Sequence, residues 1–385
     1  MKDRIVITHM MRTPVGKYGK SLSKLSAVDL GTIAAKGLIG QTKIDPNIID
    51  QAIIGNVISA GTGQNLARQI ALNSGMSENS TAMTINEVCG SGAKAVKLAY
   101  NALAMNDVNV VLAGGTESMS NAPYFLNGVR FGVKFGNQEL LDGLQKDGLL
   151  DAFSNQAMGV TAENVAKKYN VSRQDQDNFA FRSHKLANKI ALSSNMQKFI
   201  LKLNNLTNDE AIRSNPNLDS LNQLKPAFEK NGTVTAGNSS SLSDGAAMTL
   251  LMKESMANKL NLTPIAYISG YSEVGIDPNI MGFAPYKAIK SLLEKQNEVV
   301  DDIDLFEINE AFAAQCLAVI NELHIPLEKV NVYGGSIAIG HPLGSTGTRL
   351  IINMVSELEE FHKNRGIVSM CIGGGLGIAL EITRY

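Results

Sequence analysis

The sequence predicts an α/β protein that consists of two similar halves with an irregular segment between them. Two observations carry this prediction. Short apolar runs, many of them β-branched, alternate with stretches of helical period, and such alternation is typical of a sheet whose strands are largely buried. The same order of elements also occurs twice along the chain at nearly equal spacing, which indicates an internal duplication.

The individual elements follow from these patterns in chain order. Short apolar runs predict strands at 5–8, 51–57, 108–113, 249–252, 265–271, 303–308, 331–333 and 366–371. Helical periodicity predicts helices at 27–37, 92–105, 163–168, 289–294, 311–323 and 347–359.

The duplication is clearest around two asparagines. Asn56 closes an apolar run and is followed 33 positions later by Cys89, whereas Asn309 closes a similar run and is followed 32 positions later by His341. Cys89 and His341 both stand beside glycines and ahead of a predicted helix, which leads into an apolar strand that ends in glycines. The matching offsets argue against chance and place Cys89 and His341 at equivalent points of the two halves.

The segment 119–243 is less regular than the rest. It is rich in Asn, Lys, Asp and Gly and has a helical centre near 161–192. Long irregular segments in compact proteins are usually lids or binding loops, so we expect this segment to cover a site. A loosely packed helical appendage is the structural alternative, and the sequence leaves it open.

Composition excludes several classes of function. The chain of 385 residues is 44% hydrophobic and 18% charged with a net charge of -1, which indicates a globular protein without the basic field that nucleic acid requires. Three cysteines are a poor disulfide framework and favour a reducing compartment. There is no secretory signal and no apolar stretch near the ~20 residues of a membrane helix. We therefore expect a cytoplasmic protein that binds neither nucleic acid nor membranes.

Cys89 opens the segment Cys-Gly-Ser-Gly (89–92), where a strand is expected to give way to a helix. The glycines permit a sharp turn and close approach of a substrate. The positive end of a helix dipole favours the thiolate, and the arrangement resembles the nucleophile elbow of hydrolases. A small buried cysteine that caps a core helix is the structural alternative, and the motif alone does not exclude it.

His341 and Cys371 lie in two further glycine-rich segments. His341 stands within 334–344 and titrates near neutrality, which suits proton transfer or polarisation of a carbonyl oxygen. Cys371 ends a strand-like run, where a second thiol could take a proton and return it, and the N–H groups of the following glycines could stabilise an oxyanion. A structural histidine and a core cysteine are the alternatives.

Asn309 precedes a predicted helix, which it could cap, or its amide could face a reacting carbonyl. Cys316 lies within that helix beside Leu317 and is expected in the core. The positions 89, 341 and 371 lack the short paired intervals of structural zinc sites, so we expect no metal.

Taken together, these blocks resemble the thiolase family. Four motifs occur in the family's order: Asn-Glu-Val-Cys-Gly-Ser-Gly (86–92), Asn-Glu-Ala-Phe-Ala (309–313), Gly-His-Pro-x-Gly (340–344) and Cys-x-Gly-Gly-Gly-x-Gly (371–377). Further matches at 12–16, 114–120 and 235–238 extend the resemblance over essentially the whole chain. It implies a duplicated five-layered α/β/α/β/α fold with an inserted loop domain. The N-terminal half would comprise 1–118 plus 244–263, the inserted loop domain 119–243 and the C-terminal half 264–385.

The resemblance also implies the chemistry. Cys89 would take the acyl group after activation by His341, and Cys371 would shuttle a proton to and from the substrate or coenzyme A. His341 with a water held by Asn309 would form one oxyanion hole, and the backbone N–H groups of Cys89 and Gly373 the other. The implied reaction is the reversible condensation of two acetyl-CoA to acetoacetyl-CoA and CoA, without a metal or a separate cofactor.

Substrate contacts and assembly follow from the same resemblance. Ser240 and Ala236 match positions that face the pantetheine arm of coenzyme A, whereas Arg213 and Ser220 match positions near its nucleotide end. Pocket-wall positions are matched by Leu149, Met158, Phe228, Met281 and Phe312. The family forms homodimers or, more often, homotetramers.

The sequence departs from the family's pattern outside the catalytic positions. Leu66 stands where proline is common, and Ala157 replaces the histidine of a His-Met-Gly triplet. Ser241, Ser243, Thr346 and the segment 284–286 also differ. These departures put the substrate and the coenzyme A contacts in question, but not the reaction type.

Three other functions stay open on the sequence. The first is a degradative 3-ketoacyl-CoA thiolase for longer chains, because Ala157 could leave extra room in the pocket. The second is a cysteine hydrolase that uses Cys89 and His341 alone and leaves Cys371 without a role. The third is a catalytically silent acyl-CoA-binding or assembly protein, against which the retention of all four catalytic positions argues.

Overall fold

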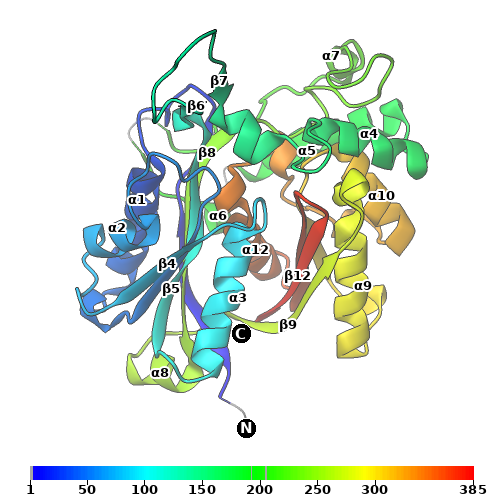
Figure 1. Ribbon diagram of the computed structural model, residues 1–385. Coiled ribbons are helices and arrows are strands. Elements are labelled where there is room, and N and C mark those ends of the chain that lie inside the picture. Colours follow the sequence, from blue (N-terminus) through cyan, green and yellow to red (C-terminus); the bar gives the residue numbers. More distant parts are fainter. Residues whose placement is uncertain (1–2, 192, 204–205) are drawn as a thin grey trace.

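The computed structural model describes residues 3–191, 193–203 and 206–385 and has a layered architecture (Figure 1). Two groups of strands enclose a central pair of helices, α3 (Ser91–Ala104) and α12 (Leu343–Glu360). Further helices cover the outer side of each group, so that helices and strands alternate in five layers. The chain therefore has the duplicated five-layered α/β/α/β/α fold that the resemblance implies.

The first group of strands runs in the order β1 (Ile5–Arg12), β8 (Ser243–Lys253), β5 (Val110–Ser118), β3 (Gln51–Gly55) and β4 (Thr81–Ile85), with β2 (Gly16–Lys17) paired to β8. Its outer face is covered by α1 (Ala27–Thr42) and α2 (Leu66–Asn73), and α8 (Glu254–Lys259) follows β8. Helix α1 begins at a capping box, in which Ser26 Oγ accepts from the Asp29 N–H and the Asp29 carboxylate accepts from the Ser26 N–H.

The second group repeats this order with β9 (Ala266–Gly275), β12 (Leu376–Arg384), β11 (Arg365–Ile372) and β10 (Leu305–Ile308). Its outer helices are α9 (Ala284–Gln296) and α10 (Ala313–Leu323), and the short α11 (Ser336–Ile339) precedes α12. The two groups join where β1 pairs with β9, but only Val6 and Ile7 take part in that pairing. The junction between the halves is therefore a narrow seam in an otherwise continuous sheet.

Glycines let the two central helices touch at their N-termini. A Cβ atom at Gly347 would lie 2.4 Å from the backbone nitrogen of Ala93, and one at Gly92 would lie 2.8 Å from the carbonyl oxygen of Gly344. Real Cβ atoms do not approach backbone this closely, so larger residues would force α3 and α12 apart. This contact brings the turns that carry Cys89 and His341 to the same side of the molecule.

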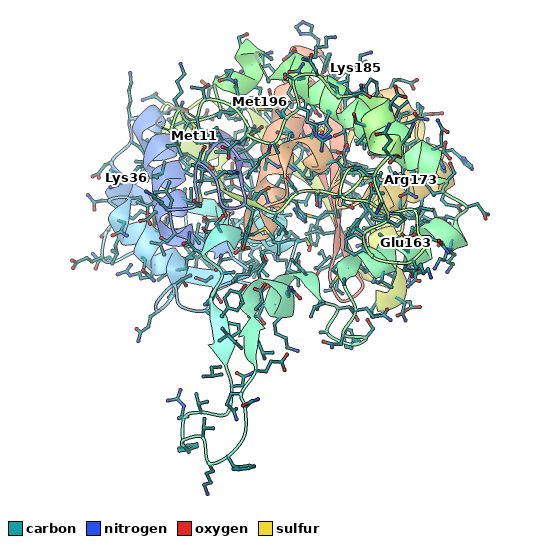
Figure 2. All side chains as sticks on the ribbon, turned by 90° about the horizontal axis from the view of Figure 1, so that it is seen from above. Met11, Lys36, Glu163, Arg173, Lys185 and Met196 are labelled. Carbon is teal, nitrogen blue, oxygen red and sulfur yellow. The ribbon has the colours of Figure 1, made fainter. Side chains whose placement is uncertain are left out.

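The segment between β5 and β8 lies over this side. It contains a hairpin of β6 (Tyr124–Leu126) and β7 (Leu140–Asp142), a single π-helical turn Gln145–Leu149, and the helices α4 (Met158–Lys168), α5 (Arg173–Ile190), α6 (Ser194–Gln197) and α7 (Leu218–Asn222). Helices α4 and α5 pack on the second half through apolar residues such as Val165 and Phe179. The loop of the hairpin stands away from the body of the molecule (Figure 2).

One predicted strand is wrong. The residues 331–333 form a turn, and only Val330 makes a bridge to Phe306, at the position that β4 holds in the first half. The side chain of Asn331, whose φ is 45°, bonds both the N–H and the carbonyl oxygen of Ile308. Its amide thus replaces the backbone ladder that a strand would have supplied.

Three strands, β2, β4 and β12, and the hairpin of β6 and β7 were not predicted. Strand β4 alternates polar and apolar residues at the sheet edge, and β12 follows directly on a glycine run.

Among the described residues, no helix combines the length and the hydropathy that crossing a membrane would require.

Candidate active site

A cavity of about 520 Å³ lies where the two central helix N-termini meet the inserted segment. We call it the cysteine cavity. It is lined by these residues singled out from the sequence: Cys89, Leu149, Met158, Phe228, Ala236, Ser240, Met281, Phe312, His341, Cys371 and Gly373. The three cavity-lining groups able to exchange protons, the two thiols and the imidazole, therefore share one space.

The turn before α3 presents Cys89 to this cavity. Val88 has a φ of 45°, a left-handed conformation that β-branched residues rarely adopt. The hydroxyl of Ser91 closes the turn, since it accepts from the Glu87 N–H at 2.8 Å and donates to the Val88 carbonyl at 2.7 Å. The sharp bend leaves Cys89 half-buried against the cavity, although the rest of the helix face is packed in the core.

The thiol of Cys89 is neutral in the free protein. Desolvation by the surrounding protein raises its pKa to about 12, and the nearby carboxyl of Glu117 acts in the same direction. Backbone N–H groups of Gly373 and Cys89 point at the sulfur and lower the pKa in part, but they do not compensate for desolvation. The helix terminus favours the thiolate as expected, but the apolar surroundings of Cys89 raise its pKa by more than the dipole lowers it.

His341 is a neutral base whose proton position is fixed by its neighbour. Its Nδ1 lies 2.7 Å from Thr346 Oγ1, and that hydroxyl donates to the Pro342 carbonyl at 2.9 Å. A hydroxyl that donates to a carbonyl must accept from the ring, so the proton sits on Nδ1 and Nε2 is free to accept one. Burial, with a smaller contribution from Arg349, lowers the His341 pKa to about 3.

Asn309 lies behind His341 and does not line the cavity. Its Nδ2 is 3.4 Å from His341 Nε2, and its Oδ1 accepts from Ser336 Oγ at 2.5 Å. Ser336 in turn accepts from the buried guanidinium of Arg349 at 2.6 Å. This chain of donors orients the amide so that its N–H groups face His341 and the cavity beyond it.

Cys371 is the penultimate residue of β11 and is almost completely buried at the cavity wall. Burial, followed by the proximity of Cys89, raises the pKa of its thiol. Both thiols are thus protonated at rest, and a reaction must begin with proton transfer between groups inside the cavity. Cys316, by contrast, lies in the core of α10 as expected and does not reach this space.

Glu117 joins the loop that follows β3 to the turn that carries His341. Its carboxylate accepts from the Gly344 N–H at 2.8 Å, from the Val57 and Ile58 N–H groups, and from Asn56 Nδ2. The buried carboxyl has its pKa raised to about 7 by desolvation, against the opposing effect of these donors. Glu117 holds the turn that follows His341 onto the first half of the molecule.

The outer part of the cavity is apolar. Phe228 and Phe312 pack edge to face with ring centroids 6.0 Å apart. Ala157, one of the departures from the family pattern, lines the wall at the start of α4 and contributes only a methyl group there. An apolar channel that ends in paired thiols can hold a thioester with a flexible arm.

Two residues expected near the nucleotide lie outside the cavity. The backbone N–H of Arg213 faces His184 Nδ1 at 3.4 Å, and Ser220 lies in α7, where its N–H is capped by Asn217.

Within the described ranges, no group of three or more His, Cys, Asp or Glu side chains could hold a metal ion.

Several residues of the site were not assigned a role from the sequence. Thr346 was noted only as a departure, and Ser336, Arg349 and Glu117 act through contacts with residues far away in the sequence. Glu117 lies in the segment 114–120 that matches the thiolase family, and this match is the one feature of the sequence that points to it. Spacing alone cannot identify such partners, because each bond depends on how the halves pack.

The arrangement can carry out acyl transfer through a covalent thioester. A thiol beside a neutral imidazole supplies nucleophile and base, converging N–H groups can bind an oxyanion, and a second thiol can exchange a proton with the incoming group.

Comparisons with known proteins agree with this geometry. Residues 5–255 match the family model described as Thiolase, N-terminal domain, and residues 262–384 match Thiolase, C-terminal domain. A probable acetyl-CoA acyltransferase of Staphylococcus aureus (strain COL) is 43% identical over 391 residues, which cover 99% of both chains.

Solved structures are equally similar. The acetyl-CoA acetyltransferase of Bacillus anthracis superimposes with a TM-score of 0.96 at 39% identity and covers 100% of this chain and 99% of its own. Human mitochondrial 3-ketoacyl-CoA thiolase gives the same TM-score and identity over 99% of both chains.

Proposed function

Because the chain belongs to the thiolase family and is an acyltransferase, we propose that it acts as an acetyl-CoA C-acetyltransferase, which condenses two acetyl-CoA reversibly to acetoacetyl-CoA and CoA. The observation that carries the proposal is the meeting of Cys89, His341 and Cys371 in one cavity. A hydrolase would need only the first two of these groups.

In the first half-reaction, Cys89 attacks the thioester carbonyl of acetyl-CoA. His341 Nε2 takes the thiol proton as the carbon–sulfur bond forms, and the backbone N–H groups of Cys89 and Gly373 meet the developing oxyanion. Collapse breaks the bond to coenzyme A, whose sulfur leaves with the proton of Cys371. Acetyl-Cys89, imidazolium and the Cys371 thiolate remain.

In the second half-reaction, the Cys371 thiolate takes a proton from the methyl group of another acetyl-CoA. His341, now charged, and a water held by the amide of Asn309 would stabilise the enolate oxygen. The carbanion attacks acetyl-Cys89 and forms the new carbon–carbon bond. Cys89 then leaves as a thiolate and recovers its proton from His341, so all three groups return to their starting state.

The substrate would enter through the apolar part of the cavity. Ser240 and Ala236 line it at the place proposed for the pantetheine arm, and Leu149, Met158 and Met281 form its walls. Arg213 and Ser220 lie beyond the cavity, where the nucleotide of coenzyme A would extend. The mechanism needs no metal and no separate cofactor.

A second candidate is a degradative 3-ketoacyl-CoA thiolase for longer chains. The observation in its favour is the small side chain of Ala157 in the cavity wall, where the family commonly has histidine. The ratio of kcat/KM for acetoacetyl-CoA and for 3-ketohexanoyl-CoA separates the two. The short-chain proposal expects acetoacetyl-CoA to be preferred, and a strong preference for the longer substrate would overturn it.

Brief exposure to acetyl-CoA, followed by intact-mass analysis and peptide mapping, tests the reaction itself. We expect an acetyl group on Cys89 that free coenzyme A removes. An adduct that water removes at the same rate would indicate a hydrolase, and the absence of any adduct would indicate a catalytically silent relative.

We further propose a cytoplasmic homodimer or homotetramer, with the β6–β7 hairpin in the contact between copies. Phe131 and Phe135 in its loop are 93% and 97% exposed, far more than an isolated chain in water favours. Light scattering should give an assembly that Phe131→Ser with Phe135→Ser reduces in size. A wild-type monomer would contradict this proposal.

A further inference from the structure

Three ionisable side chains meet beside the turn that carries Cys89. Glu87 lies two residues before Cys89, Lys94 lies in the first turn of α3, and Glu273 lies in β9 of the second half. Lys94 Nζ is 3.0 Å from Glu87 Oε1 and 2.6 Å from Glu273 Oε2, so one ammonium group contacts two carboxyl groups. We call Glu87 and Glu273 the carboxyl pair. Neither residue lines the cysteine cavity.

Glu87 also belongs to the turn through its backbone. Its N–H donates to Ser91 Oγ at 2.8 Å, and its carbonyl oxygen accepts from the Gly90 N–H at 2.9 Å. The next residue is Val88, whose left-handed φ of 45° bends the chain. A displacement of the Glu87 side chain therefore acts on the backbone that sets the position of Cys89.

The two members of the carboxyl pair cannot both be charged without cost. Glu273 lies within hydrogen-bonding reach of Glu87, but a carboxylate has no proton to donate to another carboxylate. Glu87 Oε2 is buried and accepts from no donor among the described residues, while Lys94 contacts the other oxygen. A single proton held between the two groups removes the repulsion and supplies a donor.

The neighbouring donors determine which carboxyl group holds this proton. Glu273 Oε2 accepts from Lys94 Nζ and from the Tyr271 hydroxyl, each at 2.6 Å, which stabilises its charge. Desolvation raises the pKa of Glu273, but these hydrogen bonds outweigh it and hold the pKa below its usual range. The remaining charged group nearby, Lys97, lies over the Tyr271 ring at 4.8 Å and also favours a charged Glu273.

Glu87 is the less well stabilised of the two. Its side chain is 15% exposed against 31% for Glu273, and Lys94 is the one cation that contacts it among the described residues. Desolvation, followed by the neighbouring Glu273, raises the pKa of Glu87 to about 7. Glu87 is therefore the protonated member below this pH, and Glu273 is the charged one.

We propose that Glu87 is a positioning residue, which shares one proton with Glu273 and so fastens the turn that carries Cys89 to β9. With the proton in place, the carboxyl pair and Lys94 have no net charge. Loss of the proton leaves two carboxylates on one ammonium group, and their repulsion moves Glu87 and the turn away from β9. The effect on acetyl transfer rests on the proposed function, whereas the shared proton does not.

Melting temperatures of Glu87→Gln and of the wild type from pH 5.5 to 8.5 test the shared proton. A glutamine amide is always neutral and can always donate to Glu273, so it imitates the protonated carboxyl. Because the pKa of Glu87 is raised from 4.5 to about 7 by folding, its contribution to stability is complete below pH 4.5 and is lost as the pH rises through 7. The melting temperature of the variant should therefore rise relative to the wild type by about 1–3 °C over this range. A difference that does not change with pH would overturn the proposal.

Two further variants locate the proton. Glu273→Gln removes the like charge beside Glu87, so its melting temperature should also rise relative to the wild type as the pH increases. If it does not, Glu87 titrates independently of Glu273 and the carboxyl pair is refuted. Glu359→Gln is the matched control, because it breaks an exposed ion pair with Lys198 that contains a single carboxylate. Its difference from the wild type should stay constant.

The rate at which acetyl-CoA acetylates Cys89, measured by rapid quench, tests the positioning role. We expect Glu87→Gln and the wild type to react within about twofold of each other at pH 6 and the variant to be at least about threefold faster at pH 8.5. The ratio of the two rates cancels the ionisation of the thiol, which is common to both proteins. A ratio that stays constant would refute the positioning role. If the wild type took up no acetyl group at any pH, the proposed function would fail, and the melting temperatures would still decide whether the proton is shared.

Discussion

The turns that carry Cys89 and His341 each precede a central helix and occupy equivalent positions in the two halves, but they are built differently. The Cys89 turn bends sharply through Val88 in a left-handed conformation and leaves the thiol half-buried at the cavity. The His341 turn is buried, its Nδ1–H donates to the Thr346 hydroxyl, and the Asn309 amide lies against its Nε2. One turn exposes its side chain by backbone geometry, whereas the other fixes its side chain through polar contacts.

This difference agrees with the proposed roles of Cys89 as nucleophile and His341 as base. A nucleophile must reach the carbonyl carbon and then carry an acyl group, so it needs open space around one atom. A base must hold one tautomer and one orientation, so it benefits from partners on both sides. The duplication places Cys89 and His341 at equivalent positions of the two halves, and their local contacts give the two side chains different environments.

The largest expected effect comes from removing either thiol. Cys89→Ala should abolish acyl uptake and overall transfer by at least ~10⁴-fold, because no other nucleophile lines the cavity in a comparable place. Cys371→Ala should still accept an acetyl group on Cys89 but should lose the condensation step by about 10²–10⁴-fold. Rapid-quench mass analysis of each half-reaction separates the two variants, and equal loss of both steps in Cys371→Ala would refute its role in carbon–carbon bond formation.

The His341 turn is tested through its hydrogen-bond partner. Thr346→Val leaves the Nδ1 proton of His341 unpartnered in a buried site and should lower kcat by about tenfold to hundredfold. Thr346→Ser keeps the hydroxyl and should retain nearly full activity. If the valine variant raised KM and left kcat unchanged, Thr346 would serve substrate binding and not the imidazole.

The pH dependence of Cys89 alkylation by iodoacetamide tests whether the thiol and the imidazole of His341 are both neutral in the free protein. With its pKa raised to about 12 and that of His341 lowered to about 3, the two groups are both neutral in the free protein between pH 6 and 9. Below the thiol pKa, the thiolate fraction and the iodoacetamide rate should rise about tenfold per pH unit. A rate that is already constant at pH 6 would indicate a thiolate–imidazolium pair at rest.

Much of this site could be predicted from the sequence, because glycine-rich turns, buried strands and their spacing are local features. Cys371 stands near the end of a strand, Cys89 and His341 stand in turns before the central helices, and the duplication placed these two in equivalent positions. The resemblance to the thiolases supplied the wall positions that now line the cavity, such as Met158 and Phe312.

Long-range contacts could not be predicted. The failed strand at 331–333 depends on the Asn331 side chain reaching Ile308, and the neutral state of Cys89 depends on how deeply the halves enclose it. The bonds of Glu117 to Gly344 join residues 227 positions apart. Such features follow from tertiary packing, which no local pattern of residues contains.

The smallest expected effect concerns the strained backbone before Cys89. Val88→Ala and Val88→Gly both remove the side chain, but only glycine adopts the φ of 45° without steric cost. Glycine should therefore be the more stable variant by about 1 kcal/mol, the reverse of the order found in ordinary strands and helices. Melting temperatures measured in parallel check this order. If alanine were the more stable variant, the left-handed bend would carry no strain, and the exposure of Cys89 would have to come from packing alone.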